Sequence, residues 1–300
     1  MDFLKYKNFY YIFSGILIIA SVLGMTLWGF RLGIDFKGGS ILEVEFSKVR
    51  PDNEKIREGL KEFNFAELVL QPTQEKGFLL RFGDIPEETH QKIIEKLKEI
   101  TLSQDSENKL EEKRFDSIGP VIGKELQASA LKMIILALLS ISLYVAWAFR
   151  RVSRPVASYK YGIATLIALF HDVLITCGFF SYLGHFGGVE LGIPFIVALL
   201  TLLGYSVSDT VVVFDRIREN LTKSSEKTFE GLVNKSLRQT MVRSLNTSLG
   251  VIFVLFAIYF FGGETLKYFV LALIVGISFG TYSSIFIAAP LLISFLRRRI

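Results

Sequence analysis

Six apolar stretches, each long enough to cross a lipid bilayer, constrain this chain more than any other feature. About 20 helical residues, rising 1.5 Å each, cross a hydrocarbon core about 30 Å thick. The chain has 300 residues, 51% of them hydrophobic, and the excess is concentrated in these stretches. The pattern predicts a polytopic α-helical membrane protein with six transmembrane helices, at roughly 9–30, 130–149, 159–183, 191–214, 244–262 and 266–296.

The first and last stretches need separate interpretation. The first follows Lys5 and Lys7 and has no small-residue cleavage site, so we expect a retained anchor rather than a cleaved signal peptide. The last is about 30 residues long, which predicts a helix that is tilted or partly interfacial.

Lysine and arginine are distributed unequally between the two sets of short loops, and such residues mark the cytoplasmic side. Loops 184–190 and 262–267 contain only Lys267. We therefore predict that both termini are cytoplasmic and that the net charge of +5 is a topology signal rather than a nucleic-acid-binding surface. The opposite side would carry sixteen basic residues: Lys5, Lys7, Arg150, Arg151, Arg154, Lys160, Arg216, Arg218, Lys223, Lys227, Lys235, Arg238, Arg243, Arg297, Arg298 and Arg299.

Residues 31–129 are charged and do not belong in lipid, so we predict a domain on the outer side between the first and second spans. Their pattern predicts strand, helix, strand, strand, helix, strand, the order of a ferredoxin-like α+β domain. The segments are ILEVEF (41–46), PDNEKIREGLKEF (51–63), AELVLQP (66–72), GFLLRFG (77–83), IPEETHQKIIEKLKEI (85–100) and KRFDSIG (113–119). Residues 1–30 would then form the cytoplasmic N-terminus and first span, and residues 130–300 the remaining five spans.

A basic loop, residues 215–243, is predicted between the fourth and fifth spans. Its helical periodicity indicates a linker lying along the cytoplasmic membrane surface. The three histidines show no metal-ligand spacing, and His90 and His185 are expected to be ordinary surface residues. The single cysteine, Cys177, lies in an apolar stretch and excludes a disulfide framework.

Polar residues interrupt the apolar pattern near the cytoplasmic ends of the fourth and fifth spans. Asp209 lies six residues before Asp215, where the fourth apolar run ends. Arg243 opens the fifth span, with Asn246 and Thr247 close behind it. Asp or Arg at a helix centre costs about 2.5–3.5 kcal/mol in lipid, so we expect both to face the bundle interior.

Two interpretations of these residues remain open. Arg243 and Thr247 are four residues apart and share a helix face, so a carboxyl, a guanidinium and a hydroxyl could converge. Such a cluster would be a proton-responsive switch, with Asp209 either ionised and bound to Arg243 or protonated and released. The alternative is a static ion pair that only sets helix register.

Two further features of the spans are predicted from spacing. His171 and Asp172 lie in the third span, but adjacent helical residues point about 100° apart and would not form one site by themselves. Their role is either a relay or a structural hydrogen bond. Gly276 and Gly280 form a G-x-x-x-G pair in the last span and are followed by Thr281, Ser283 and Ser284, which indicates close helix packing and interhelical hydrogen bonding.

An ordered set of motifs resembles the SecD/SecF family of protein-export membrane proteins. GYSVSDTVVVFDRIREN (204–220) and VRSLNTS (242–248) resemble the fourth- and fifth-span motifs of the SecF branch. The remaining motifs are GIDFKGG (33–39), GPVIGKEL (119–126), HD (171–172) and GTYSSIFIAAP (280–290), so the resemblance extends over essentially the whole chain.

The resemblance implies a bacterial inner-membrane subunit that pairs with SecD and forms one six-span half of an assembly similar to resistance-nodulation-division exporters. It implies that the proton-motive force promotes protein export, with the SecYEG translocon, YajC and unfolded exported polypeptides as partners. Asp209, Arg243 and Thr247 match the family's proton-pathway residues, although Ser208 stands where the family commonly has Asn. Asp35, Gly38 and Gly39 would form a turn that couples span to domain.

Three other functions are weighed. The chain could be a scaffold for SecD without proton transfer of its own, or half of an exporter of lipids or small molecules. An intramembrane aspartyl protease would need Asp172 and Asp209 to share a proton, and the expected G-x-G-D is absent before Asp209. We expect no enzymatic activity, no cofactor and no metal.

Overall fold

The structure is a computed structural model that describes residues 3–65, 68–73, 75–105, 107–150, 155–223, 225–226 and 228–297. The chain divides into two compact units, one formed by Met1–Arg31 with Ala130–Ile300 and the other by Leu32–Ser129. We call them the helical unit and the α/β unit. Of the basic residues used to predict topology, Arg151, Arg154, Lys227, Arg298 and Arg299 lie outside the described residues.

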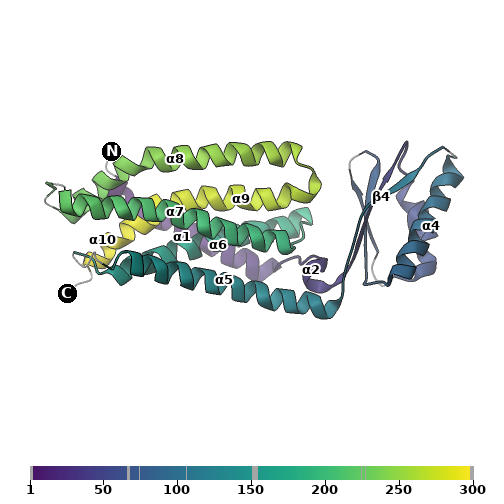
Figure 1. The fold of residues 1–300 in the computed structure, drawn as a ribbon, viewed down its shortest axis with the longest axis horizontal. Helices are drawn as coiled ribbons and strands as arrows, with labels where there is room; N and C mark the ends of the chain where they lie inside the picture. Colours follow the sequence, from purple (N-terminus) through teal and green to yellow (C-terminus); the bar gives the residue numbers. More distant parts are fainter. Residues whose placement is uncertain are drawn as a thin grey trace. The chain divides into compact units, whose positions relative to one another are not determined.

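The helical unit consists of long apolar helices that run side by side (Figure 1). Within the described residues, six helices are long and apolar enough to cross a membrane, which confirms the predicted number. After a short 3₁₀ turn, η1 (Phe3–Tyr6), they are α1 (Lys7–Trp28), α5 (Pro120–Ala148), α6 (Ser158–Gly187), α7 (Ile193–Lys223), α8 (Phe229–Phe261) and a last composite helix.

The last span is one apolar stretch with an interruption in its helical geometry. It begins as α9 (Glu264–Ser283), passes through a π-helical segment η3 (Ser284–Ala288) and ends as α10 (Ala289–Arg297). A π-helix inside an α-helix is uncommon and is frequently found at functional sites. Here it directly follows Ser283, at the level where polar side chains meet.

The prediction of a membrane-surface linker at 215–243 is wrong. Most of these residues belong to the two neighbouring helices, because α7 extends to Lys223 and α8 begins at Phe229. The Thr228 hydroxyl accepts a hydrogen bond of 3.1 Å from the Gly231 amide and caps α8. The apolar residues that suggested a membrane-surface helix instead pack in the core: Leu232, Val233 and Leu237 join Val213, Phe214 and Ile217 of α7.

Small residues allow the helices to approach closely. A Cβ atom at Gly280 would lie 2.9 Å from the Ser206 Cβ, and one at Gly276 would lie 2.6 Å from a methyl of Leu202. These contacts seat the G-x-x-x-G face of α9 against α7. The Ser181 hydroxyl of α6 also lies 3.0 Å from the Gly24 carbonyl of α1.

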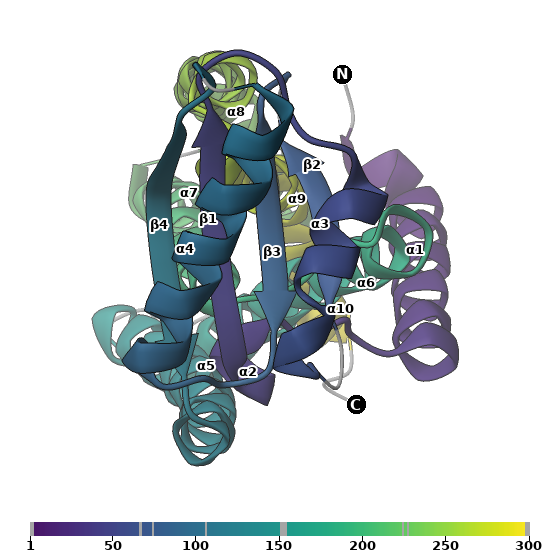
Figure 2. The ribbon, with the colours of Figure 1, turned by 90° about the vertical axis from the view of Figure 1, so that its right-hand side faces the viewer.

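The α/β unit contains one sheet and two longer helices. Its elements are α2 (Ile34–Lys37), β1 (Gly39–Phe46), α3 (Asn53–Gly59), η2 (Lys61–Phe63), β2 (Val69–Thr73), β3 (Gly77–Phe82), α4 (Glu87–Gln104) and β4 (Leu110–Ile118). The strands pair antiparallel in the order β2-β3-β1-β4. Figure 2 shows α3 and α4 on the same face of the sheet.

The core of this unit lies between that face and the two helices. Alternate residues of β1 and β3 point inward, and helical residues such as Ile56, Ile93 and Leu97 meet them. Several boundaries differ from the prediction by a few residues; for example, the first helix ends at Gly59, the second continues to Gln104, and the last strand begins at Leu110. A Cβ atom at Gly59 would lie only 2.4 Å from the Ile100 Cδ1, so glycine allows α3 to approach α4.

His90 is not the surface residue that was predicted, because only 3% of it is exposed. Its ring stacks on Phe115 of β4 with centroids 3.7 Å apart, and its Nδ1 lies 2.9 Å from a Glu87 carboxylate oxygen. His90 lies three and seven residues before Ile93 and Leu97, so it shares their inward face of α4. The helical period places it in the core despite its polarity.

Candidate functional site

Asp209 lies on α7, where α7, α8 and α9 meet, and is 7% exposed. Its Oδ2 accepts hydrogen bonds from the Ser248 hydroxyl of α8 at 3.3 Å and the Thr281 hydroxyl of α9 at 3.2 Å. These two hydroxyls are themselves 2.5 Å apart. The carboxylate therefore faces the bundle interior, in a cluster of three oxygens contributed by three helices.

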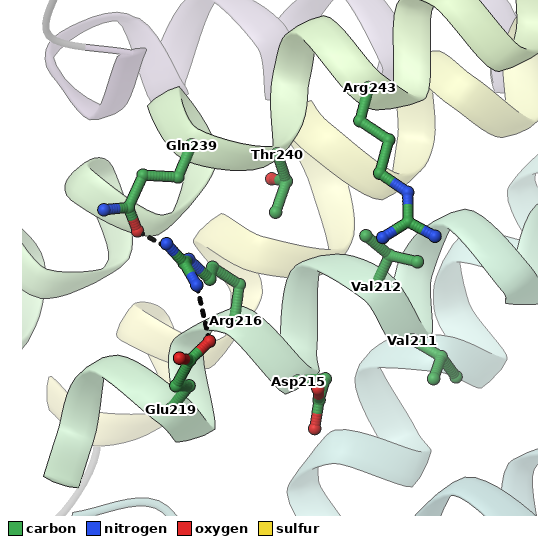
Figure 3. A pocket seen from close by; sticks show the side chains of 8 residues that line it. All are labelled: Val211, Val212, Asp215, Arg216, Glu219, Gln239, Thr240 and Arg243. Carbon is green, nitrogen blue, oxygen red and sulfur yellow. Dashed lines mark hydrogen bonds and ion pairs between the residues drawn. The ribbon is translucent and has the colours of Figure 1, made fainter. Parts of the chain in front are cut away.

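Arg243 does not contact this carboxylate directly. Among the described residues, no ion pair within 4.0 Å joins it to Asp209, although it is close enough to interact electrostatically. Its side chain is exposed and lies at a pocket of about 550 Å³ between α7 and α8. In Figure 3 the guanidinium extends toward Val212, apart from the hydrogen-bonded group of Arg216, Glu219 and Gln239.

Thr247 does not join the cluster either. Its hydroxyl donates within its own helix, to the Arg243 and Ser244 carbonyls at 3.0 Å each. The predicted convergence of carboxyl, guanidinium and the Thr247 hydroxyl is absent from this arrangement of the described residues, and Ser248 supplies the hydroxyl from α8. The reason is helical phase, because Ser248 points about 100° away from Thr247 and into the bundle.

A polar strip instead remains exposed along α7 and α8. It consists of Ser208, Arg243, Asn246 and Thr247, all on the surface of the helical unit. Ser208 is therefore turned away from the carboxylate of Asp209, the next residue in the chain. An exposed Arg within an apolar stretch is costly in lipid, so this strip is suited to contact protein or water rather than acyl chains.

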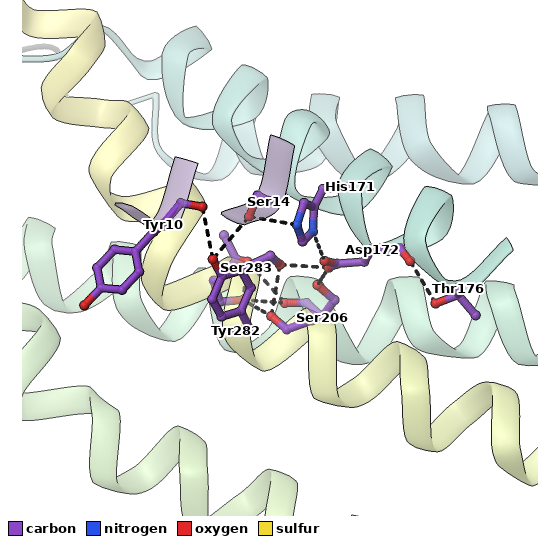
Figure 4. Close-up of polar contacts among 11 residues, drawn as sticks. Tyr10, Ser14, His171, Asp172, Thr176, Ser206, Tyr282 and Ser283 are labelled. Carbon is purple, nitrogen blue, oxygen red and sulfur yellow. Dashed lines mark hydrogen bonds and ion pairs between the residues drawn. The ribbon is translucent and has the colours of Figure 1, made fainter. Parts of the chain in front are cut away.

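A second polar cluster surrounds Asp172, which is completely buried (Figure 4). Its Oδ1 lies 2.8 Å from the His171 Nδ1, and its Oδ2 accepts hydrogen bonds from Ser206 at 2.6 Å and Ser283 at 2.9 Å. His171 and Asp172 were not expected to form one site by themselves, and they contact each other as parts of a larger cluster that includes Ser206 and Ser283. Their side chains bend toward each other across the 100° offset between adjacent residues.

The same cluster reaches α1. The His171 Nε2 lies 3.2 Å from the Ser14 hydroxyl, which donates to the Tyr282 hydroxyl at 3.2 Å. Tyr282 in turn donates to the Tyr10 carbonyl at 3.2 Å (Figure 4). Polar contacts thus connect α1, α6, α7 and α9.

Three of these hydroxyl residues, Ser14, Ser206 and Ser248, were not predicted, whereas Thr281, Ser283 and Ser284 were expected to form hydrogen bonds between helices. A further contact joins Thr210 to Ser284 at 2.8 Å. A signal was present, since serine and threonine recur at 206 and 210 on one face of α7 and cluster at 281–284. Isolated hydroxyls are common in membrane helices, however, so the recurrence alone did not identify a site.

The glycine pair of the α/β unit adopts conformations that other residues rarely take. Gly38 has φ of 82° and Gly39 has φ of 130°. A Cβ atom at Gly38 would lie 2.7 Å from the Pro120 Cα, and one at Gly39 would lie 2.9 Å from the Phe82 carbonyl oxygen. Asp35 lies half-buried in the preceding turn, α2. The motif therefore brings the start of β1 tightly against the start of α5.

The described residues contain no group of three or more His, Cys, Asp or Glu side chains that could hold a metal ion.

Comparison with known families places these features in context. Residues 98–298 match the family model described as protein export membrane protein SecD/SecF, C-terminal, and residues 29–48 match the SecD/SecF GG motif. The chain belongs to the SecD/SecF family. Asp172, Asp209 and Arg243 fall within the first match, and Gly38 and Gly39 within the second.

Curated relatives carry the name Protein translocase subunit SecF. One from Thermobaculum terrenum is 44% identical over 98% of this chain and 93% of its own length. One from Anaerolinea thermophila is 38% identical with the same coverage of both chains. Membership of the SecD/SecF family therefore corresponds to a role in transport.

Two solved structures share the fold of nearly the whole chain. SecDF from Thermus thermophilus, described as a translocon-associated membrane protein, has a TM-score of 0.81 and 33% identity over 99% of this chain. SecDF in a super-membrane-facing form has a TM-score of 0.70 and 31% identity. The chain spans 39% of each of those longer chains.

Proposed function

We propose that this chain works with SecD as one half of a membrane assembly that uses the proton-motive force to promote protein export. Membership of the SecD/SecF family supports this proposal, as does the fold shared with SecDF, whose chains are longer. In the complete assembly, the exposed strip of Ser208, Arg243, Asn246 and Thr247 faces SecD. This contact would remove Arg243 from lipid, where a central Arg costs about 2.5–3.5 kcal/mol.

The hydrogen bonds of Asp209 are the observation that supports a proton-dependent role for this chain. Its Oδ2, the Ser248 hydroxyl and the Thr281 hydroxyl lie within 2.5–3.3 Å of one another, and Ser248 also lies 2.8 Å from the Ser244 carbonyl. The two hydroxyls hold two hydrogens for these four contacts, so some of the contacts are alternatives to one another. The buried Ser244 hydroxyl also lies beside Asp209. A carboxyl surrounded by hydroxyls, each of which can donate or accept, is suited to a change of protonation.

Arg243 provides the alternative partner in the proposed cycle. When Asp209 loses its proton, the buried negative charge requires a partner, and the Arg243 guanidinium is the nearby cation. Proton binding would return the carboxyl to Ser248 and Thr281. Moving one charge through the membrane potential releases about 2.3 kcal/mol per 100 mV, which shifts a two-state equilibrium roughly fifty-fold.

The α/β unit is proposed to be a ferredoxin-like domain on the outer side of the bacterial cytoplasmic membrane, with both chain termini in the cytoplasm. The strand order β2-β3-β1-β4 and the two helices on one face support the ferredoxin-like assignment. The excess of basic residues in the short loops supports the orientation. In this position the domain would act on unfolded polypeptides emerging from SecYEG, with YajC as an accessory partner.

Translocation of a preprotein into membrane vesicles, with and without an ionophore, tests the proposal. We expect Asp209→Asn to assemble with SecD but to lose gradient-dependent export, and Arg243→Ala to be similarly impaired. Asp215→Asn, on the exposed end of the same helix, is the matched control. Normal gradient-dependent export by Asp209→Asn would support the rival function, a scaffold for SecD, and transport of a lipid or small molecule instead would support an exporter half.

A further inference from the structure

The buried carboxylates of Asp172 and Asp209 differ in how completely their oxygens are bonded. Asp172 accepts from two hydroxyls and is paired with His171, so three donors on α6, α7 and α9 surround its two oxygens. Asp209 shares two hydroxyls that also serve each other. Asp172 is thus held through both of its oxygens by donors from three helices, whereas the hydroxyls of Ser248 and Thr281 both bind one oxygen of Asp209.

The two clusters are linked through the same pair of helices. Ser206, which binds Asp172, precedes Asp209 by three residues on α7, and Ser283 follows Thr281 by two residues on α9. Thr210, the residue after Asp209, contacts Ser284, the residue after Ser283, at 2.8 Å. The spacing of α7 from α9, which decides whether Thr281 reaches Asp209, is therefore set one turn away by Asp172.

Close packing makes this linkage stiff. The absence of a side chain at Gly280 brings the α9 backbone against Ser206, where a Cβ atom would lie 2.9 Å from the Ser206 Cβ. The π-helical segment begins immediately after Ser283, so the bond from Ser283 to Asp172 holds α9 at the point where its geometry changes. Such segments differ from regular helix by a small backbone rearrangement and are sites where a helix can shift.

We propose that Asp172, oriented by His171, is a positioning residue that clamps α7 to α9 and thereby sets the hydroxyl partners of Asp209. This inference rests on the proposed proton-dependent function of Asp209. The titratable groups packed around the two clusters are His171 from α6, Tyr282 from α9 and Arg243 from α8, while α1 contributes the Ser14 hydroxyl and the Tyr10 carbonyl. Asp172 holds the two helices together through its hydrogen bonds with Ser206 of α7 and Ser283 of α9.

Modification by dicyclohexylcarbodiimide, which reacts with protonated carboxyls in apolar surroundings, provides a test. The full chain is co-expressed with SecD in membrane vesicles, and modification of the Asp209 peptide is followed by mass spectrometry as the pH is varied. Peptide analysis separates Asp209 from Asp172. The midpoint is the pH at which modification of Asp209 is half-maximal. We expect Ser206→Ala and Ser283→Ala each to shift this midpoint by about half a pH unit or more, a roughly threefold change in the proton affinity of Asp209.

Ser278→Ala is the matched control. Ser278 lies on α9, is exposed and donates only to the Ile274 carbonyl of its own helix at 2.7 Å, so its loss is expected to leave the midpoint unchanged. Two separate serine variants keep the test decisive if one of them fails to accumulate in the membrane. An unchanged midpoint in the variants that do accumulate would overturn the clamp.

The proposed function is tested separately in the same vesicles. If Asp209→Asn abolishes gradient-dependent export while Ser206→Ala and Ser283→Ala leave the midpoint unchanged, the function stands and the clamp is wrong. If Asp209→Asn exports normally, the proposed function fails, and the clamp loses its part in export whatever the midpoints show.

Discussion

The Ser248 hydroxyl of α8 donates to the Asp209 carboxylate of α7 at 3.3 Å, although Thr247, its neighbour in the chain, is exposed and bonded to its own helix. One helical step thus separates a hydroxyl inside the bundle from one on its surface. The two residues are therefore expected to serve different partners.

Removing either hydroxyl at Asp209 should weaken gradient-dependent export. We expect Ser248→Ala and Thr281→Ala each to lower its rate about two- to tenfold, since one hydrogen bond contributes about 0.5–1.5 kcal/mol. The measurement is preprotein translocation with an imposed proton gradient, with Ser278→Ala as control. Wild-type rates in both variants would show that these hydroxyls do not take part.

Thr247 should matter only in the assembled complex. Thr247→Val keeps the shape but removes a hydroxyl that is exposed in this chain, so we expect the thermal midpoint of the isolated subunit to stay the same. In vesicles with SecD, gradient-dependent export should fall, and Thr247→Ser should retain it. A loss of stability in the isolated subunit would place Thr247 in the interior and contradict this account.

The glycine pair should resist substitution. Gly38→Ala combines a φ of 82° with a Cβ atom 2.7 Å from the Pro120 Cα, so we expect destabilisation of the α/β unit by about 1–3 kcal/mol. Protease susceptibility of residues 32–129 in the whole chain, followed during thermal unfolding, measures this effect. Gly83→Ala, with no atom within 4 Å of the added Cβ, is the control and should behave as wild type.

The stability of the α/β unit should depend on Glu87 in acid. Hydrogen bonds from Gln91 and then His90 hold the pKa of Glu87 below its ordinary value of 4.5. A carboxyl with a lowered folded-state pKa stabilises the fold fully above its unfolded value, and this contribution is lost as the pH falls through the folded value. Wild type should therefore lose stability in acid more steeply than Glu87→Gln.

The same protease assay, repeated between about pH 3 and about pH 6, measures this difference. Glu95→Gln, an exposed change on the same helix, is the control. Parallel pH profiles for wild type and Glu87→Gln would show that protonation of Glu87 does not affect the stability of the α/β unit.

The lengths of the apolar stretches and the periodicity of the sequence were enough to predict the number of spans and the order of elements in the α/β unit. Six spans follow from apolar length, because a hydrocarbon core requires about 20 apolar helical residues to cross it. The order of strands and helices in residues 31–129 follows from local period, and the expectation that Asp209 faces the bundle follows from the cost of an acidic side chain within an apolar run. These properties depend on neighbours along the chain, so the sequence carries them directly.

Only the tertiary structure decided which groups meet. Thr281 lies 72 residues beyond Asp209 and reaches it because Gly280 lets α9 approach α7. His90 is buried because its position on α4 faces Phe115, and the residues predicted as a surface linker became core because α7 and α8 pack there. Partners of this kind depend on how each helix is rotated and how closely it packs, and those are settled by contacts between distant segments rather than by local pattern.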